Sequence, residues 1–157
     1  YTGEDTLSLH DALPICGIHF SVNLEVLPPD SVGGSFELKA EPELLRSLIE
    51  NLLDNALKYS PDGATIQVTL FDRGAHLVLM IEDAGEGIPA GILDKLFERF
   101  YRSESNRDEI SGSGLGLSIV RRIADLHQGS VVASNRPAGG ACFEVVLPRD
   151  PDGIKNF

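Results

Sequence analysis

The 157-residue sequence contains no run of about 18 consecutive apolar residues, the length that a membrane-spanning helix requires, so no membrane contact is expected from it. It is also short of cations, because 13 lysine and arginine residues stand against 24 aspartate and glutamate residues and the net charge is −11. Such a charge repels a nucleic acid, which argues against nucleic-acid binding. A phosphate ligand remains compatible with it where the few cations gather at one site.

Cysteine is scarce as well. Cys16 and Cys142 are the only two and have no metal-ligand spacing, so we expect reduced, buried thiols in a cytosolic protein. The start lacks the features of a signal peptide and has no methionine, which suggests a fragment. Residues 1–16 fit no structural period and are interpreted as a non-native or disordered leader. One domain is expected over residues 17–148, followed by a tail over residues 149–157.

Alternation of apolar and polar side chains predicts strands. It marks residues 18–27 as a half-buried strand and Phe36 with Leu38 as a short second one. Further strands are predicted over residues 65–71, 77–82, 130–134 and 142–147. The run LVLMI within 77–82 is apolar on both sides, which predicts a central position in the sheet.

Apolar residues at helical spacing predict two long helices, over residues 42–59 and 115–127, and a short helical piece over 92–97. The expected core positions are Leu45, Leu48, Ile49, Leu52, Leu53 and Ala56 in the first helix and Leu115, Ile119, Ile123 and Leu126 in the second. Hairpin-linked strands alternating with two helices predict an α/β fold. Its sheet should be mixed and mostly antiparallel, with the helices on one face.

The first helix carries a polar stripe beside its apolar face. Asn51, Asn55 and Lys58 follow one another at i, i+4 and i+7, so they share one side of the helix. A carboxamide oxygen suits Mg²⁺ and a lysine suits phosphate. A solvated polar face explains the same pattern, so the stripe alone leaves both interpretations open.

Asp83 follows the predicted central strand and precedes a glycine loop, Ala84-Gly-Glu-Gly87. A carboxylate at the floor of a pocket accepts a hydrogen bond from the exocyclic amine of adenine and leaves the guanine carbonyl unpaired. Two other interpretations remain open at this point. Asp83 can form a turn with its own backbone, or it can make an acid–base pair with Glu86.

The segment GSGLG over residues 112–116 opens the second long helix. Glycines there let backbone N–H groups approach a phosphate at the positive end of the helix, although a flexible hinge would also use them. Leu117 stands where a dinucleotide-binding motif needs glycine, and the sequence has no G-x-x-x-x-G-K-[ST] loop. The polar residues 102–113 before it have no apolar period and are predicted to form a lid.

Four segments occur in a fixed order: NLLDNALKYS (51–60), DAGEGIP (83–89), LFERFYR (96–102) and GSGLGLSIV (112–120). With them the sequence resembles the histidine-kinase branch of the superfamily that includes gyrase, the heat-shock chaperone ATPase and a mismatch-repair ATPase. The resemblance covers roughly residues 18–148. It implies a two-layer α/β sandwich with an ATP lid, and binding of ATP with Mg²⁺. It also implies transfer of the γ-phosphoryl group to a histidine on a separate dimerisation domain, in bacterial two-component signalling.

The resemblance assigns roles position by position. Asn55 is similar to the Mg²⁺ ligand, with Asn51 assisting; Lys58 and Arg102 are similar to the phosphate-contacting cations, and Asp83 to the adenine-reading carboxylate. The other implied nucleotide-binding positions are Tyr59, Gly85, Gly87, Ile88, Phe97, Phe100, Gly112, Ser113, Gly114, Leu115, Gly116 and Leu117. The catalytic set is Asn51, Lys58 and Arg102.

Asn51 favours a kinase over an ATPase. The hydrolysing relatives carry glutamate here as the base that activates water, and an amide cannot take that proton. ATP should therefore stay intact until an imidazole arrives in line. The segment beginning at His10 superficially resembles the phosphoacceptor motif. It lacks the arginine, however, and the residues before Glu41 are too few for a helical hairpin, so His10 is not expected to accept phosphate.

The implied partners are the dimerisation and phosphoacceptor domain of the same kinase and a downstream response regulator. The fragment is expected to be monomeric and cytoplasmic, and its parent a homodimer anchored in the bacterial inner membrane. Two other functions remain open: a serine kinase of the anti-sigma type, and a nucleotide-binding module without phosphotransfer. One departure from the family is Glu41, where aspartate is usual before the first helix; glutamate caps a helix less well.

Overall fold

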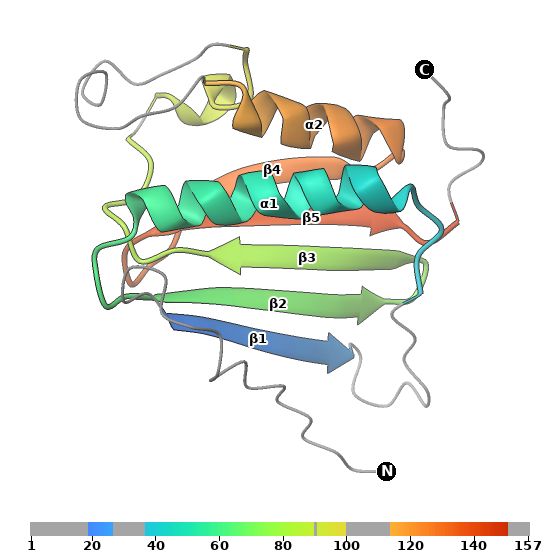
Figure 1. Cartoon of the computed structure of the whole chain (residues 1–157), viewed down its shortest axis with the longest axis horizontal. Coiled ribbons are helices and arrows are strands. Elements are labelled where there is room, and N and C mark those ends of the chain that lie inside the picture. Colours follow the sequence, from blue (N-terminus) through green and yellow to red (C-terminus); the bar gives the residue numbers. More distant parts are fainter. Residues whose placement is uncertain (1–18, 27–36, 90, 100–113, 151–157) are drawn as a thin grey trace.

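The computed structural model describes the backbone of residues 19–26 and then residues 37–89, 91–99 and 114–150. Its elements follow the predicted order except for one strand (Figure 1). They are β1 (His19–Val26), α1 (Pro42–Tyr59), β2 (Thr65–Arg73), β3 (His76–Glu82), the short 3₁₀ helix η1 (Leu93–Lys95), α2 (Gly116–Leu126), β4 (Ser130–Asn135) and β5 (Ala141–Pro148).

The five strands form one sheet in the order β1-β2-β3-β5-β4. β1 runs parallel to β2, and every other neighbouring pair is antiparallel, so the sheet is mixed and mostly antiparallel as predicted. β3 lies between β2 and β5, which confirms its central position. Its last residue, Glu82, pairs with Cys142 near the start of β5, so the loop after β3 and the β4–β5 turn lie at the same end of the sheet.

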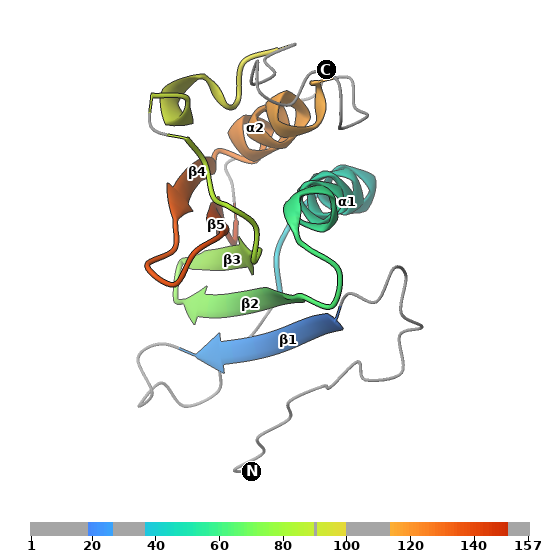
Figure 2. The ribbon, with the colours of Figure 1, turned by 90° about the vertical axis from the view of Figure 1, so that its left-hand side faces the viewer.

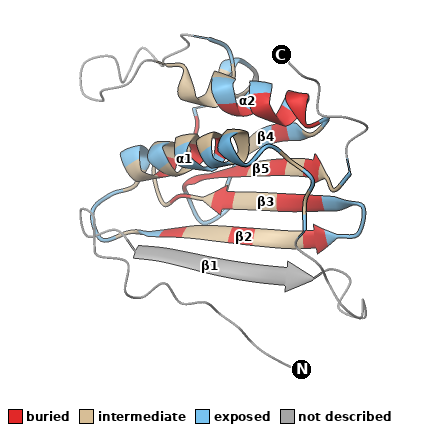
Figure 3. Cartoon of the chain, turned by 45° about the vertical axis from the view of Figure 1, so that its right-hand side comes forward, coloured by how far each residue is buried: buried red, intermediate tan, exposed pale blue. Residues whose placement is uncertain are grey.

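Both long helices cover the same face of the sheet, and the other face carries no described helix (Figure 2). The core between the two layers is apolar, and burial in Figure 3 concentrates on the sides of the helices and strands that face each other. Its buried members are Leu48, Leu52, Ala56, Ile66, Ile81, Ile88, Val120, Ile123, Ala124, Val131, Ala141, Phe143, Val145 and Leu147. This arrangement confirms the predicted two-layer α/β fold.

Two predicted core positions are wrong. Ile49 is 38% exposed and Ile119 is 39% exposed, whereas Val120 is fully buried. The buried stripes fall at Leu48 and its i+4 successors in α1, and at Val120 and its i+3 and i+4 successors in α2. A residue next to such a stripe points about 100° away from it, so it lies at the rim of the contact instead of inside it.

The short strand predicted at Phe36 and Leu38 is also wrong in the part that the structure describes. Leu38 lies in coil and packs partly against the core, and Phe36 falls outside the described residues. Burial of Leu38 beside the first helix accounts for its apolar character, and β2 already has a partner strand on each side. Helical structure within 92–97 is likewise shorter than predicted, only the 3₁₀ turn η1.

Candidate functional site

The site begins where the C-terminal end of α1 meets the loop that follows β3. The Ala84 N–H donates to Ser60 Oγ at 3.4 Å. A side chain on Gly85 would collide with the backbone carbonyl of Tyr59, so this position requires glycine for close approach, not for a left-handed turn. The fold therefore brings Tyr59, Gly85 and Asp83 together.

Asp83 is 2% exposed and its carboxylate is held from two sides. Oδ1 accepts hydrogen bonds from the Gly85 N–H and the Ala141 N–H, each at 2.9 Å. Oδ2 accepts none from the described residues. The turn-forming and ligand-binding interpretations of Asp83 are thus compatible, because each uses a different oxygen. The alternative pair with Glu86 is not formed, since Glu86 is exposed and its side chain makes no contact with Asp83.

The polar stripe on α1 divides into a fixed and an open part. Asn51 Nδ2 donates to the Ser47 carbonyl at 2.7 Å, which holds the amide in one orientation. Asn55 is half-buried, and its side chain makes no hydrogen bond with any residue that the structure describes. Lys58 is exposed, with its ammonium 5.7 Å from the centre of the Tyr59 ring. Asn55 is therefore the amide whose oxygen is available to a cation.

The start of α2 lies beside Asn51. A side chain on Gly116 would come within 2.9 Å of Asn51 Oδ1, so glycine lets the positive end of α2 approach this amide. Gly114 has a positive φ of 70°, which glycine tolerates best, and Leu115 is the N-cap residue. The first N–H groups of a helix lack partners within it, so they can face an anion at this end.

The remaining predicted positions divide into three groups. The first group packs into or against the hydrophobic core and so supports the site from inside the protein; its members are Ile88, Phe97 and Leu117. Gly87 has a φ of 86° in the loop. The predicted residues Phe100, Arg102, Gly112 and Ser113, and the lid that contains three of them, lie outside the described residues.

The sequence predicted the two strands of the β4–β5 hairpin, but not the contacts that this hairpin makes with the loop after β3. Asn135 and Arg136, at the end of β4, contact the loop of residues 83–88, and Gly140 packs on the Asp83 backbone. The sequence showed only a turn there, with two glycines. No local signal marks these residues, because their partners lie about 50 positions away in the chain.

Other groups in the described part of the chain offer no competing metal site. No cluster of three or more histidine, cysteine, aspartate or glutamate side chains is arranged to hold a metal ion there. Cys142 is buried as expected, and burial, followed by the nearby Glu82 and Glu144, raises the pKa of its thiol above the usual range. A divalent cation here would therefore depend on amide oxygens and on the ligand's own phosphates.

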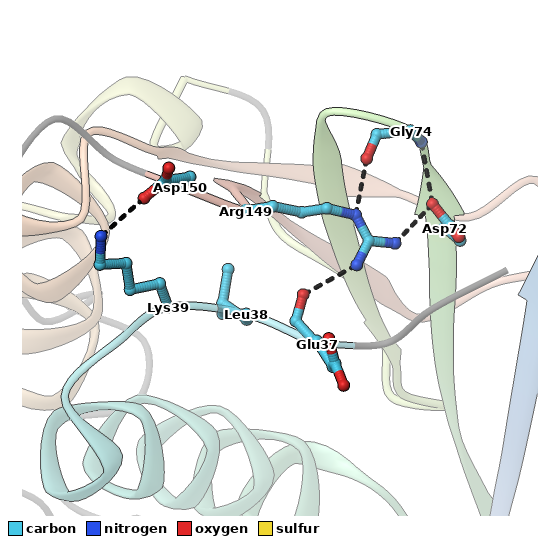
Figure 4. A pocket seen from close by; sticks show the side chains of 7 residues that line it. All are labelled: Glu37, Leu38, Lys39, Asp72, Gly74, Arg149 and Asp150. Atoms are coloured by element: carbon cyan, nitrogen blue, oxygen red, sulfur yellow. Dashed lines mark hydrogen bonds and ion pairs between the residues drawn. The ribbon is translucent and has the colours of Figure 1, made fainter.

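A hollow of about 670 Å³ lies at the other end of the sheet, and both cations that line it are paired (Figure 4). Arg149 donates to the Gly74 and Glu37 carbonyls at 2.6 and 2.8 Å and contacts Asp72 Oδ1 at 2.6 Å. Lys39 Nζ lies 3.0 Å from Asp150 Oδ1. Leu38 completes the lining. Since its cations already contact carboxylates or carbonyls, this hollow does not offer the unpaired groups found around Asp83.

Comparison with known proteins gives a consistent picture. The family model described as "Histidine kinase-, DNA gyrase B-, and HSP90-like ATPase" matches residues 40–151. The signal transduction histidine-protein kinase AfsQ2 of Streptomyces coelicolor is 35% identical over 147 residues, which make up 94% of this chain and 27% of that protein. The kinase BaeS of Escherichia coli is 36% identical over 132 residues, covering 83% of this chain and 27% of BaeS.

Solved structures agree with these relatives. The mycobacterial sensor histidine kinase MprB aligns with a TM-score of 0.73 at 31% identity, over 92% of this chain and 91% of that one. The catalytic domain of histidine kinase ThkA aligns with a TM-score of 0.71 at 25% identity, over 92% of this chain and 89% of that one. The chain spans about a quarter of the length of the two curated relatives. No helix in the described ranges is long and apolar enough to cross a membrane.

Proposed function

This chain belongs to the family of histidine kinase-, DNA gyrase B- and HSP90-like ATPases, in its histidine-kinase branch, and from that premise we propose a specific reaction. It binds ATP with Mg²⁺ between the end of α1, the loop of residues 83–88 and the start of α2. The γ-phosphoryl group then passes to a histidine on a separate domain. Of the groups around this space, Asp83 supports the proposal most directly.

Asp83 combines burial with an oxygen left open. Two backbone N–H groups hold Oδ1, so the carboxylate cannot turn away, and Oδ2 remains for a donor from a ligand. The exocyclic amine of adenine is such a donor. Guanine would place a carbonyl against the same oxygen, and the resulting loss of a buried hydrogen bond would favour ATP over GTP.

The residues present fit a Mg²⁺–triphosphate group. Asn55 has an amide oxygen without a partner among the described residues, and Gly116 brings the start of α2 close to Asn51, since a Cβ atom there would lie 2.9 Å from Asn51 Oδ1. We assign Asn55 as the Mg²⁺ ligand, with Asn51 beside it, and Lys58 and Arg102 as the cations for the phosphates. The bound ion would neutralise phosphate charge, while the chain supplies position and further charge.

The position of Asn51, beside the proposed phosphate subsite, supplies no base for hydrolysis. Asn51 is a carboxamide, and its delocalised lone pairs are not basic enough to deprotonate water. In the proposed reaction the imidazole nitrogen of the acceptor histidine forms the new P–N bond. The bond from the γ-phosphorus to the bridging oxygen breaks, and ADP leaves with that electron pair.

The remaining parts of the proposal concern the whole protein. We infer that the acceptor histidine lies on a dimerisation domain of the same kinase and that a response regulator receives the phosphoryl group from it. The fragment is then a monomer on the cytoplasmic side, and its parent is a homodimer anchored in the bacterial inner membrane. We further assign residues 17–148 as the catalytic domain.

Calorimetric titration tests nucleotide binding. We expect ATP to bind more tightly with Mg²⁺ than without it. Asp83→Asn keeps both backbone hydrogen bonds to Oδ1 but replaces the open acceptor with a donor, so ATP affinity should fall about 100-fold. The exposed Asp62 offers a matched control, since Asp62→Asn makes the same change outside the site. Equal affinity of the two variants would contradict the role of Asp83.

The metal role is tested separately. Asn55→Ala should remove most of the Mg²⁺-dependent gain in ATP affinity and leave metal-free ADP binding within about twofold. Asp54→Ala, on the exposed side of the same helix, is the control and should retain the gain. A Mg²⁺ effect that persists in Asn55→Ala would show that another group holds the ion.

Phosphotransfer is tested by incubating the chain with γ-³²P-ATP and the histidine-bearing helical hairpin of a sensor kinase. We expect label on the hairpin that is lost in acid and retained in alkali, as for phosphohistidine. Acid-stable label on serine would support the anti-sigma type of kinase instead. Binding of ATP without any transfer would support a nucleotide-binding module.

A further inference from the structure

The β4–β5 hairpin holds the loop of residues 83–88 through Asn135. The amide of this residue makes a matched pair of bonds with the backbone of one residue: Oδ1 accepts from the Ile88 N–H at 2.6 Å, and Nδ2 donates to the Ile88 carbonyl at 2.8 Å. Two antiparallel bonds fix both the distance and the tilt of the backbone. Ile88 is 8% exposed, so little water is available to replace them.

The next residue holds the other end of the same loop. Arg136 Nη1 donates to the backbone carbonyl of Asp83 at 2.8 Å, and its Nε lies 3.0 Å from Glu82 Oε1. Both side chains of this ion pair are about one-fifth exposed. A partly buried pair of this kind has a more definite geometry than a surface pair. Arg136 therefore restrains the backbone from which the Asp83 carboxylate projects.

The backbone of the hairpin adds a third restraint. Asp83 N–H donates to the Ala141 carbonyl at 2.9 Å, and the Ala141 N–H donates back to Asp83 Oδ1. A side chain on Gly87 would come within 2.8 Å of Asn135 Oδ1, so the loop approaches the amide as closely as its backbone allows. The hairpin thus contacts the beginning, the middle and the end of residues 83–88.

We propose that Asn135 and Arg136 are positioning residues for the adenine subsite, acting through the loop of residues 83–88. This inference rests on the proposed function. Both atoms of the Asn135 amide are engaged with Ile88, so the residue acts on the loop. Its effect should fall on recognition of the base and spare the Mg²⁺-dependent contribution of the phosphates. Selectivity for ATP over GTP should depend on it, because that selectivity requires Asp83 Oδ2 at a fixed place.

The test measures affinity and selectivity together. Asn135→Ala removes both bonds to Ile88, and we expect ATP and ADP affinity to fall by the same factor, about tenfold, with the gain from Mg²⁺ unchanged. The ratio of ATP to GTP affinity should fall several-fold. Val132→Ala on the same strand is the control, because Val132 is 53% exposed and lies outside these contacts. Thermal unfolding monitored in parallel shows which variants remain folded.

Selectivity separates positioning from simple support of the fold. If folded Asn135→Ala keeps the parent's ATP affinity and ATP-to-GTP ratio while its melting temperature falls, Asn135 only stabilises the domain and its role in the inference is refuted. Arg136→Lys provides a second variant in case Asn135→Ala does not fold. It keeps a cation near Glu82 but cannot serve both contacts, and we expect about a threefold loss for ATP and ADP alike.

Failure of the proposed function would look different. If the unsubstituted chain binds neither ATP nor ADP, the function and this inference fall together. If the unsubstituted chain binds ATP with selectivity over GTP, and Arg136→Lys has the same ATP affinity and the same ATP-to-GTP ratio, only the role of Arg136 in the inference is refuted. Unchanged values in both Asn135→Ala and Arg136→Lys refute the inference as a whole and leave the proposed function standing.

Discussion

The two ends of helix α1 are built differently. At its C-terminal end, Asn55 and Asp83 Oδ2 have no partner among the described residues. At its N-terminal end, the buried His127 bonds both helices: Nδ1 donates to the Ile123 carbonyl at 2.9 Å, and Nε2 accepts from the Glu41 N–H at 3.3 Å. At the same end of the sheet, Arg149 contacts Asp72 and two backbone carbonyls.

This difference separates groups that serve a ligand from groups that serve the fold. A polar group that makes no bond inside the protein adds nothing to the stability of the fold and is available to a ligand. A group with all its partners inside the protein contributes stability and leaves nothing for a ligand. Substitutions at the C-terminal end of α1 should therefore affect nucleotide binding, whereas those at the N-terminal end should affect only the free energy of unfolding.

The largest effect is expected from a substitution of Gly140, near the proposed nucleotide site, and the adjacent Gly139 provides its control. Gly140 has a φ of 88° and would collide with the Asp83 carbonyl if it carried a side chain, whereas Gly139 has a φ of 93° and open space around it. Gly140→Ala should lower the free energy of unfolding by about 3 kcal/mol or more and abolish ATP binding. Gly139→Ala should lose only about 1 kcal/mol and retain binding. Urea unfolding measures the change in free energy, and calorimetry measures ATP binding. Similar values for the two variants would contradict the role assigned to the close contact at Gly140.

His127→Ala tests the other end. The side chain is 1% exposed and bridges α1 and α2, so its loss should lower the free energy of unfolding by about 3 kcal/mol. At a temperature where the variant remains folded, ATP affinity should stay within about twofold. The exposed His76 supplies the control, and His76→Ala should leave both values nearly unchanged. A loss of ATP affinity in folded His127→Ala would mean that the two ends are coupled.

A buried and an exposed ion pair at this end should differ in their contribution to the free energy of unfolding. Asp72→Asn weakens a pair whose side chains are 20% and 10% exposed, while its bond to the Gly74 N–H can persist. We expect a loss of about 1–2 kcal/mol in the free energy of unfolding. Asp150→Asn is the matched control in a pair that is 71% and 78% exposed, and its effect should be below about 0.5 kcal/mol. Urea titration resolves the difference; equal effects would show that burial does not set it.

The smallest predicted effect is a gain. Glu41 is the N-cap residue of α1 but makes no side-chain cap hydrogen bond. Aspartate is shorter and caps well, so Glu41→Asp should raise the free energy of unfolding by about 0.5–1 kcal/mol without changing ATP affinity. Glu43→Asp, inside the first turn, should give no such gain. Loss of stability in Glu41→Asp would indicate that the bond from the Glu41 N–H to His127 constrains the cap.

Local features of the sequence predicted much of this fold. The bounds of α1 agree with the prediction, because Pro42 suits the start of a helix and the Pro61-Asp-Gly63 turn ends it. The position of Asp83 after the central strand also follows from local sequence. Contacts that depend on distant packing did not. The bonds from Asn135 to Ile88 join elements about 50 residues apart, and spacing along one element carries no such information.

The parallel pairing of β1 with β2 has a consequence for how a partner domain would be delivered. His19 lies opposite Thr65, the first residue of β2, and β2 starts just after α1 ends at the nucleotide site. A domain joined ahead of β1 therefore attaches at the end of the sheet where ATP is proposed to bind. With a short linker, its histidine would meet the nucleotide at an effective concentration in the millimolar range. The encounter would then be governed by tether length instead of affinity between the two domains.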